Sequence, residues 1–496
     1  MMPKSTSQGQ GMGWRRMYHQ LLLAITLLLT VIDGLSNQQH SLSNKKVCII
    51  GGGPCGLFFA NHLLRQDPTV QVCVIEKAPR DGNPDLNAFG FGVGGRLKRC
   101  MDDSEIPGLV DQVDAVSAPT SFPGLRIIRR LDLCSLLRSC LEGQYGSDRF
   151  ECLYETKVLR VELDAQQLQV ESTLKQEAED NNSKTKSVIK YDLLVGADGI
   201  NSSVRRMLVD RDILKEEHYI NGPVKWKALR LPPQSDLGPT AFQPLAHPDN
   251  LLSGAVLPRY PEGHTMLVFW TDGNDNPGGI DAVQELCQEI SSAVQGKIPK
   301  KNLYRRLTWG KRGSEVKENI KIEFDEKDVE RFLNCRPGRE HYMKLDKYHY
   351  HAYNDTSSPA VALIGDAAHG MYSYLGQGCA CGFESSLRLS KCLAAHSSIR
   401  SALEAYSQEA VPEGHAISDL NLIAHIISPS TRGGFAKFVG MCQLILNGRK
   451  GKMLVVRVNA DIKYQELLKE NRLAISMSRR FWKTRRQAVE HKRPFN

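Results

Sequence analysis

The stretch Val47-Cys-Ile-Ile-Gly-Gly-Gly-Pro-Cys-Gly56 decides the fold, because it joins a short apolar run to a glycine-rich turn. The apolar run predicts a buried strand of a parallel sheet, and a helix is predicted over Leu57–Leu64. A second predicted strand, Val70–Ile75, ends at Glu76, which lies 20 residues after Gly56. The spacing G-x-G-x-x-G between a strand and a helix, with an acidic residue at this distance, is typical of a dinucleotide-binding βαβ unit.

The glycines of this motif have different predicted roles. Gly51 makes the tight turn, Gly53 lets the backbone approach a pyrophosphate, and Gly56 lets the helix pack closely on the strand. The N-terminus of the helix offers N–H groups and a partial positive charge to the phosphates. Glu76 can accept hydrogen bonds from ribose hydroxyls. A glycine turn with only a structural role is the alternative, and the βαβ context favours dinucleotide binding.

Two further apolar runs lead into aspartates, and we expect both runs to be strands of the same sheet. Tyr191–Val195 precedes Gly196-Ala-Asp198-Gly199, and Ala360–Ile364 precedes Gly365-Asp366. Ligands of parallel α/β sheets bind beyond the carboxyl ends of the strands, so these aspartates are candidates for ligand binding. Helix capping is the alternative role for an aspartate in this position. A third glycine-rich turn, before a helical run, follows at Gly376-Gln377-Gly378.

In this order and spacing, the three motifs resemble those of the flavoprotein aromatic hydroxylases, the family of para-hydroxybenzoate hydroxylase. The resemblance implies an α/β fold, with a Rossmann-type FAD-binding domain, an inserted mixed-sheet substrate domain and a helical C-terminal region. It also implies FAD as cofactor, NADPH as co-substrate, O2 and a small-molecule substrate. The cofactor-binding residues that it implies are Gly51, Gly53, Gly56, Glu76, Arg130, Val158, Asp198, Gly199, Gly365, Asp366, Gly376, Gln377 and Gly378.

The resemblance assigns separate parts of FAD to these residues. The first motif would hold the ADP half, Arg130 would contact the pyrophosphate, and the backbone of Val158 would contact adenine. Asp366 would bind the ribityl chain, and Gly376-Gln377-Gly378 would open a helix aimed at the N1/C2=O edge of the flavin. Asp198-Gly199 would serve both FAD and the approach of NADPH. We assign no catalytic side chain and no metal ligand.

Within that family, three segments resemble kynurenine 3-monooxygenase: Glu413-Gly-His-Ala-Ile-Ser-Asp-Leu420, Gly382-Phe-Glu384 and Ile462-Lys-Tyr-Gln-Glu466. The segment Val116–Arg130 departs from that enzyme, because it is too short for the hairpin that carries the Arg and Tyr of the substrate carboxylate clamp. We therefore expect the flavin-binding residues to be kept and the clamp for an amino-acid carboxylate to be missing.

The resemblance implies an FAD-dependent monooxygenase, which is an oxidoreductase. In this family NADPH reduces the flavin, O2 forms a C4a-hydroperoxide on it, and an aromatic or apolar small molecule is hydroxylated. Two alternatives stay open: a flavin oxidase or epoxidase acting on a lipid-like molecule, and an FAD-binding protein that does not hydroxylate. The sequence does not indicate which substrate is natural, and it does not give the oligomeric state.

Composition excludes several other classes of protein. The chain has 496 residues, of which 41% are apolar and 24% charged, as in ordinary globular proteins. Its 13 Cys are odd in number and scattered, which argues against a small disulfide framework, and they include no C-x-x-C pair, which argues against a structural zinc site. Most of the net charge of +9 arises after residue 448, where 14 Lys/Arg face 4 Asp/Glu. This pattern indicates a near-neutral body with a basic tail, and we expect no nucleic-acid partner.

The N-terminal region contains the charge-free run Leu21–Ile32, preceded by Arg15 and Arg16. Its 12 residues are fewer than the roughly 20 of a bilayer span and fit the apolar region of a signal peptide or signal anchor; a buried helix is the alternative. We expect the chain to divide into a signal segment, the first part of the FAD-binding domain, the substrate domain, the second part of the FAD-binding domain and a helical basic C-terminal tail, over residues 1–36, 45–210, 211–358, 359–440 and 441–496.

A signal segment predicts a location in the secretory pathway, in the membrane or lumen of the endoplasmic reticulum or in an organelle reached through it. The tail Ser478–Arg486, with Phe481 and Trp482 among its basic residues, predicts peripheral contact with an anionic membrane; a solvated tail is the alternative. In a lumenal protein Asn181 is the expected glycosylated sequon, since it lies in a polar hairpin tip.

Overall fold

The structure is a computed structural model, and it describes residues 41–81, 90–174, 183–233, 238–240, 243–246, 252–271, 325–335, 338–352, 359–423 and 434–480. The expected signal segment 1–36, the sequon at Asn181 and a helix expected over Asp281–Val294 lie outside these residues. Among the described residues, no helix has the length and apolar character that crossing a bilayer requires.

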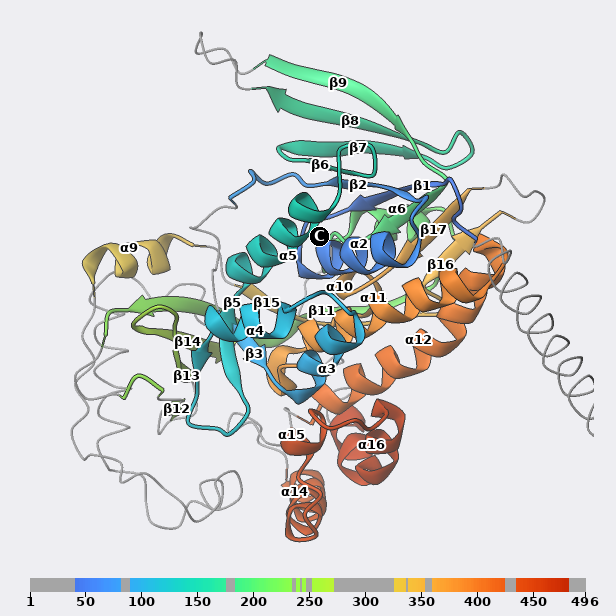
Figure 1. Ribbon diagram of the computed structural model, residues 1–496. Helices are drawn as coiled ribbons and strands as arrows, with labels where there is room; N and C mark the ends of the chain where they lie inside the picture. The colour runs from blue at the N-terminus through green and yellow to red at the C-terminus, as the bar shows by residue number, and fades with distance from the viewer. Residues whose placement is uncertain are drawn as a thin grey trace, which may run out of the picture.

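A six-stranded sheet forms the centre of the molecule, in the order β16-β17-β10-β1-β2-β6 (Figure 1). Five of its strands run parallel, and only β16 is antiparallel to its neighbour. The bounds are β1 Lys46–Ile50, β2 Gln71–Ile75, β6 Phe150–Leu153, β10 Leu193–Gly196, β16 His349–His351 and β17 Ala360–Leu363. The predicted apolar runs are therefore strands, and they are buried because helices cover the sheet.

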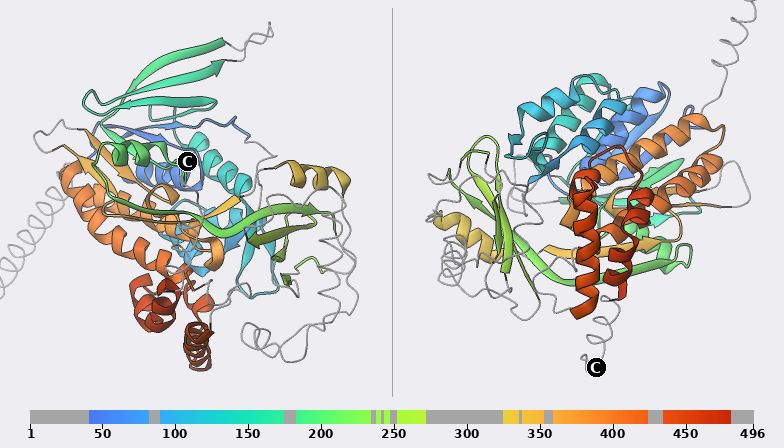
Figure 2. Two further views of the ribbon diagram at one scale, coloured as in Figure 1. Left: turned by 180° about the vertical axis from the view of Figure 1, so that it is seen from behind. Right: turned by 90° about the horizontal axis from the view of Figure 1, so that it is seen from below.

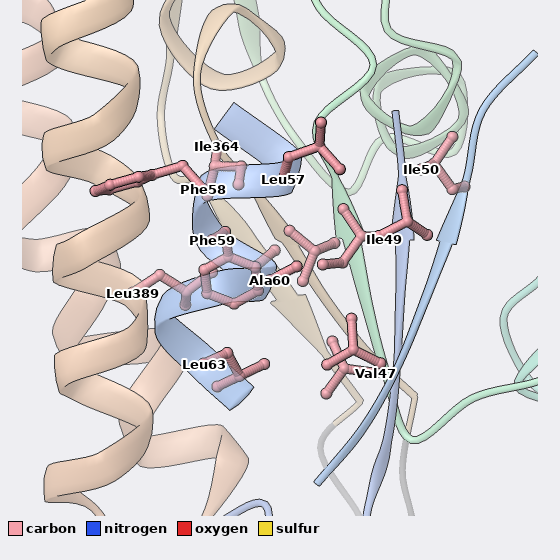
Figure 3. Packing of buried hydrophobic residues seen from close by; sticks show 14 of the residues in the cluster. Val47, Ile49, Ile50, Leu57, Phe58, Phe59, Ala60, Leu63, Ile364 and Leu389 are labelled. Carbon is pink, nitrogen blue, oxygen red and sulfur yellow. The ribbon is translucent and has the colours of Figure 1, made fainter. Parts of the chain in front are cut away.

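Helix α2 (Pro54–Gln66) packs on β1, and a second helix, α11 (Gly378–Ala395), packs on the other side of α2. Helix α2 begins with proline, whose fixed φ suits the first helical position, and its face Leu57–Leu64 is buried. The ring of Phe58 stacks on that of Phe383 in α11, with 3.8 Å between the ring centroids. Figure 3 shows the apolar side chains of α2 lying between β1 and the helix that carries Leu389. This layer fixes α2 and α11 relative to each other.

Other helices surround this layer, namely α5 (Arg130–Gln144), α6 (Ser203–Asp210), α10 (Asp366–His369), the short 3-10 helix η1 (Ser373–Leu375) and α12 (Ile399–Asn421). Helix α5 packs on α2, and α12 packs on α11. A separate three-stranded antiparallel sheet contains β7 (Thr156–Glu162), β8 (Gln167–Leu174) and β9 (Ser183–Lys190). The hairpin expected near residues 174–190 is thus present.

The segment Val116–Arg130 contains a short hairpin. Ala118 pairs with Ile127 and Pro119 with Arg126, and the expectation that the segment is too short for the hairpin of the carboxylate clamp stays a prediction. Thr120 makes the short turn possible, because its N–H donates to Leu125 O and its hydroxyl donates to the same oxygen over 2.8 Å. The hairpin belongs to a small sheet of β3 (Gly90–Val93), β4 (Ala118–Pro119) and β5 (Arg126–Arg129), next to α3 (Gly95–Asp103) and α4 (Leu109–Ala115).

The inserted domain contains a five-stranded sheet in the order β12-β13-β14-β11-β15. Every pairing in its described part is antiparallel, whereas we expected a mixed sheet. The runs Val224–Leu231 and Thr265–Trp270, whose aromatic and β-branched residues are typical of strands, lie in β11 and β14. The bounds are β11 Glu216–Leu231, β12 Gln243–Ala246, β13 Leu252–Pro258, β14 His264–Thr271, β15 Gly338–Leu345 and, for the helix packed on β11, α9 Glu326–Asn334.

The C-terminal helices gather at one end of the molecule, and the β7–β9 sheet lies at the opposite end (Figures 1 and 2). They are α14 (Gly434–Arg449), α15 (Leu454–Arg457), α16 (Tyr464–Glu470) and a last helical stretch over 472–480. Their buried residues form a second core with α12, which includes Ile417, Leu420, Tyr464, Leu467 and Ile475. The expected helical C-terminal region is therefore present.

Candidate functional site

The carboxyl ends of three neighbouring parallel strands bring the predicted motifs together. Strand β1 leads into Gly51, β10 leads into Asp198, and β17 leads into Asp366. In the sheet, β10 lies between β1 and β17. The chain passes from β1 to β2 on one side and later returns to β10 on the other, so β1 is the topological switch point at which open α/β sheets bind ligands.

Close backbone contacts require the first and third glycines of the N-terminal motif. Gly51 has a φ of 112°, and a Cβ there would lie 2.4 Å from the carbonyl oxygen of Ala197. A Cβ at Gly56 would lie 2.1 Å from the carbonyl oxygen of Gly51. A side chain at either position would collide with backbone, so the turn and the helix can approach each other only with glycine in both places.

The N-terminus of α2 is open toward Arg130. A Cβ at Gly53 would meet only Nη2 of Arg130, at 3.2 Å. No side chain caps α2, and its first turn contains no acidic residue. Because the first N–H groups of a helix lack partners within the helix, this end can bind an anion. Arg130, the first residue of α5, adds an exposed positive charge beside it.

Glu76 supports the glycine turn with both carboxylate oxygens. Oε2 accepts a hydrogen bond from the N–H of Gly52 over 2.7 Å, and Oε1 accepts one from the N–H of Ala78 over 2.9 Å. Each oxygen keeps a lone pair, so the predicted ribose contact stays a prediction. The N–H of Thr156, at the start of β7, donates a hydrogen bond to the carbonyl oxygen of Glu76. Strand β7 therefore begins beside Glu76, and the half-buried Val158 follows two residues after Thr156.

Asp366 lies between the arginine and the start of α11. Asp366 is exposed to solvent. Desolvation by the surrounding protein nevertheless raises the pKa of its carboxyl, whereas the charges of Arg130 and Arg205 lower this pKa. A Cβ at Gly378 would lie 3.9 Å from Oδ1 of Asp366. The carboxylate is therefore accessible to a ligand that also faces the N-terminus of α11.

Asp198 divides its two oxygens between two tasks. Oδ2 accepts hydrogen bonds from the N–H and the hydroxyl of Ser203 over 2.6 and 2.8 Å, so for this oxygen the capping alternative holds. Oδ1 is buried and has no hydrogen-bond partner among the described residues. A buried carboxylate oxygen without a donor is costly, which indicates that a ligand supplies the donor. Gly199 follows with a φ of 74°.

The third motif, Gly376-Gln377-Gly378, forms hydrogen bonds with the C-terminal helical region. Gly376 has a φ of 64°, and Gln377, the residue before α11, is 3% exposed. Nε2 of Gln377 donates to Oδ1 of Asn459 over 3.3 Å, and its Oε1 accepts from the hydroxyl of Tyr464 over 3.1 Å. No side chain caps α11, so its first N–H groups are left for a ligand.

Sequence reasoning missed Arg96, which joins this region to α3. Its guanidinium pairs with Glu384, lies 4.1 Å from the ring centroid of Tyr464, and donates to the carbonyl oxygens of Val458 and Ala460 over 2.8 and 3.0 Å. No motif marked Arg96. Tyr464 and Glu384 lay in segments that resembled kynurenine 3-monooxygenase, which was the one available signal.

His369 has no ligand-binding geometry. It is 1% exposed, burial lowers its pKa to about 4, and Sγ of Cys381 lies 3.6 Å from its Nδ1. Within the described ranges, no group of three His, Cys, Asp or Glu side chains is placed to hold a metal ion.

These residues fit FAD. The uncapped N-terminus of α2 and Arg130 suit a pyrophosphate, and the accessible carboxylate of Asp366 suits hydroxyl groups of a ribityl chain. The unpartnered Oδ1 of Asp198 adds a second acceptor, and the uncapped α11 adds N–H donors. The role of each individual residue stays a prediction.

Comparison with known proteins agrees with a flavin site. No protein-family model matches the chain. A kynurenine 3-monooxygenase of Salinispora arenicola (strain CNS-205) is 24% identical over 404 residues, which cover 76% of this chain and 78% of that enzyme. The kynurenine 3-monooxygenase of Caenorhabditis briggsae is 24% identical over 365 residues, which cover 68% of this chain and 70% of that enzyme.

Two solved structures share the fold. The tetrameric form of 2-methyl-3-hydroxypyridine-5-carboxylic acid oxygenase has a TM-score of 0.55 at 17% identity, covering 79% of this chain and 94% of its own. OxyS anhydrotetracycline hydroxylase from Streptomyces rimosus has a TM-score of 0.54 at 20% identity, covering 84% and 76%. The expected resemblance to the flavoprotein aromatic hydroxylases is confirmed. These flavoprotein hydroxylase relatives support FAD as cofactor and an FAD-dependent monooxygenase, an oxidoreductase, as the class of enzyme.

Proposed function

We propose that the chain is an NADPH- and O2-dependent FAD monooxygenase that hydroxylates an aromatic or otherwise apolar small molecule. The observation that carries the proposal is the meeting of Gly53, Asp198 and Asp366 at the ends of three neighbouring parallel strands. The relatives support it, because their names describe monooxygenases, an oxygenase and a hydroxylase.

Bound FAD supplies the redox chemistry, since it accepts electrons from NADPH and transfers oxygen from O2 to the substrate. The chain binds and orients it. The N–H groups at the start of α2 and the guanidinium of Arg130 hold the pyrophosphate, while Asp366 accepts hydrogen bonds from hydroxyl groups. The uncapped start of α11 would present a partial positive charge to the bound flavin, which would favour negative charge on the ring.

The arginines of the β4–β5 hairpin support the proposed substrate class. Nε of Arg126 donates to the hydroxyl of Ser117 over 2.7 Å, and its Nη2 donates to the carbonyl oxygen of Asp114 over 2.8 Å. Arg129 forms a bidentate pair with Asp132, at 2.5 and 2.6 Å. Both guanidiniums are thus engaged within the chain, which supports a substrate that needs no carboxylate clamp.

NADPH oxidation by the FAD-loaded chain, with and without candidate substrates under isotopically labelled O2, tests the proposal. We expect oxidation that the substrate stimulates and a product that carries one labelled oxygen atom. Oxidised substrate and hydrogen peroxide in equal amounts, formed without NADPH, would favour an oxidase. An epoxide would favour an epoxidase, and bound FAD without NADPH oxidation would favour a protein that does not hydroxylate.

We further propose that residues 1–36 direct the chain to the secretory route, at or inside the endoplasmic reticulum or an organelle reached through it, and that the basic tail Ser478–Arg486 contacts a membrane. The apolar run Leu21–Ile32 after Arg15-Arg16 supports the targeting proposal. Fusing residues 1–44 to a fluorescent reporter tests it. A diffuse cytosolic signal would contradict it, and a mitochondrial signal would mean that the segment has another targeting function.

A further inference from the structure

Exposed apolar side chains concentrate on the C-terminal helices. Nine large apolar residues are strongly exposed among the described residues, and six of them fall between positions 435 and 473. Phe435 is 79% exposed and Phe438 is 65% exposed, both in α14. The six are Phe435, Phe438, Leu446, Val455, Val456 and Leu473. Such a concentration marks an interaction surface, whereas single exposed apolar residues need no explanation.

The outer face of α14 is an apolar stripe. Phe435, Phe438, Cys442 and Leu446 follow one another at steps of three or four residues, which places them on one face of a helix. On the opposite face, Met441 and Leu444 pack on the core of the C-terminal helices. A surface helix normally carries polar residues on its outer face, so α14 departs from the pattern of a helix that faces only water.

Positive charge lies at the C-terminal end of the stripe and continues along the helices that follow. Residues 434–480 contain ten Lys/Arg and three Asp/Glu. Arg449 and Lys450, at the end of α14, are exposed, and so is Lys452. Helix α16 and the last helical stretch line a hollow of about 540 Å³ whose walls combine apolar and basic side chains, namely Leu468, Lys469, Arg472, Ile475, Ser476 and Arg479. Apolar groups bordered by Lys and Arg match the boundary between acyl chains and anionic headgroups.

Helix α14 is suited to lie along a bilayer. Its 16 residues extend for roughly 24 Å at about 1.5 Å per residue, less than the roughly 30 Å of a hydrocarbon core. Val455 and Val456 of the following α15 are 53% and 64% exposed, so the apolar surface continues past the end of α14. We define the C-terminal face as Phe435, Phe438, Leu446, Val455 and Val456 with the adjoining Arg449 and Lys450.

We propose that the C-terminal face docks on an anionic lipid bilayer, with α14 lying in the plane of the interface. This deepens the membrane contact proposed above, because it moves the contact from the tail to a folded surface. The proposal does not depend on the enzyme's chemistry. Figure 1 places α14 and α15 at the outer end of the molecule, where a flat surface could meet them.

Hydrogen exchange of the full chain, with and without vesicles, tests the proposal. Vesicles of phosphatidylcholine alone are compared with vesicles that also contain phosphatidylserine. We expect anionic vesicles to slow exchange over residues 434–457 and to leave the β7–β9 sheet, residues 156–190, unchanged. This local measurement stays informative if Leu21–Ile32 also inserts, because attachment by that run alone would not protect α14.

Matched variants distinguish binding through the stripe of α14 from nonspecific binding of exposed apolar residues. Phe435→Ser with Phe438→Ser should abolish the protection, and Arg449→Gln with Lys450→Gln should weaken vesicle binding by about tenfold. The controls remove exposed apolar residues elsewhere, Leu159→Ser with Val188→Ser, which are 42% and 57% exposed on β7 and β9. These controls should behave like the unchanged chain.

Three results would overturn the proposal. One is exchange over residues 434–457 that vesicles leave unchanged. The second is protection of these residues before vesicles are added, rising with protein concentration together with the mass in light scattering, because a second copy would then cover the face. The third is equal protection of residues 434–457 by vesicles in the stripe variant and its control. FAD content and NADPH oxidation, measured on the same samples, show separately whether the proposed enzyme function fails.

Discussion

The hydroxyl of Tyr464 donates a hydrogen bond to Oε1 of Gln377 over 3.1 Å, so the C-terminal helices hold the residue that precedes α11. The two residues are 87 positions apart in the chain. Arg96 lies on the face of the Tyr464 ring, and Glu384 of α11 pairs with Arg96. The C-terminal helices therefore help to position the N-terminus that we expect to face the flavin.

Tyr464→Phe should weaken FAD binding, because it removes this hydrogen bond and keeps the ring beside Arg96. We expect a loss of about 0.5–1.5 kcal/mol, or roughly twofold to tenfold in Kd, measured by flavin fluorescence. Tyr342→Phe is the matched control, since it removes a buried hydrogen bond to Asp419, 2.9 Å long, on the inserted domain. Equal changes in FAD affinity for both variants would argue against a positioning role for Tyr464.

Asp366→Ala should weaken FAD binding by about 1.5–3 kcal/mol, at least about tenfold in Kd, because a charged acceptor is lost. Asp192→Ala is the control in the same sheet. Asp192 accepts from the N–H of Lys46 over 2.8 Å at the opposite, amino end of β1, so its loss should affect stability and leave FAD affinity unchanged. An Asp366→Ala chain that binds FAD normally would remove this residue from the site.

Gly56→Ala should destabilise the chain and reduce its FAD content, since the new Cβ would lie 2.1 Å from the carbonyl oxygen of Gly51. Forcing such a contact costs about 1–3 kcal/mol, read from chemical unfolding. Gly143→Ala, in the last turn of α5, meets nothing within 4 Å and should be neutral or stabilising by about 0.4–1 kcal/mol. Similar unfolding curves for the two variants would contradict the close approach of α2 to the glycine turn.

Stability should fall with acid. Burial lowers the pKa of His369, His62 and His349 to about 4 in each case. The unfolded value is about 6.5, so the unfolded chain binds more protons between the two. The stabilisation is complete above about pH 6.5 and is lost as the pH falls toward 4, with a limiting slope of about 1.4 kcal/mol per pH unit for each histidine.

Thermal unfolding between about pH 7.5 and about pH 5 checks this prediction. His369→Asn should reduce the pH dependence, whatever its effect on the unfolding temperature at neutral pH. A thermal unfolding midpoint that does not change across this pH interval would show that burial does not hold these histidines neutral. A His369→Asn chain with the full pH dependence would show the same for His369.

L-kynurenine should be a poor substrate, because Arg126 and Arg129 are engaged by Ser117, Asp114 and Asp132. An ionised carboxylate that loses water without gaining a partner costs at least several kcal/mol. Liquid chromatography of reactions with FAD, NADPH and kynurenine measures 3-hydroxykynurenine directly. Efficient formation of that product would mean that other basic residues bind the carboxylate.

The sheet edge was predictable from sequence because its signals are local. Apolar runs of four or five residues end directly in Gly51, Gly196-Ala-Asp198 and Gly365-Asp366, and parallel strands bring such ends together. The contacts that fasten the site are not local. Arg96 and Glu384 are 288 positions apart, and no periodic pattern connects them.

The β4–β5 hairpin shows a second limit. The length of Val116–Arg130 argues against a long hairpin, but it does not reveal that the hydroxyl of Thr120 closes a short turn between strands of two to four residues. Its arginines could be found in the sequence, whereas their partners could not, because Ser117 and Asp132 acquire that role only through the folded geometry.

Titration of the purified full chain with FAD tests the central claim most directly. The account predicts that one FAD binds per chain, with a perturbed visible flavin spectrum and quenched fluorescence, and that Asp366→Ala shifts the titration to higher FAD while Asp192→Ala leaves it in place. A folded chain that takes up no FAD, or that binds it equally in both variants, would contradict the assignment of the three strand ends as a flavin site.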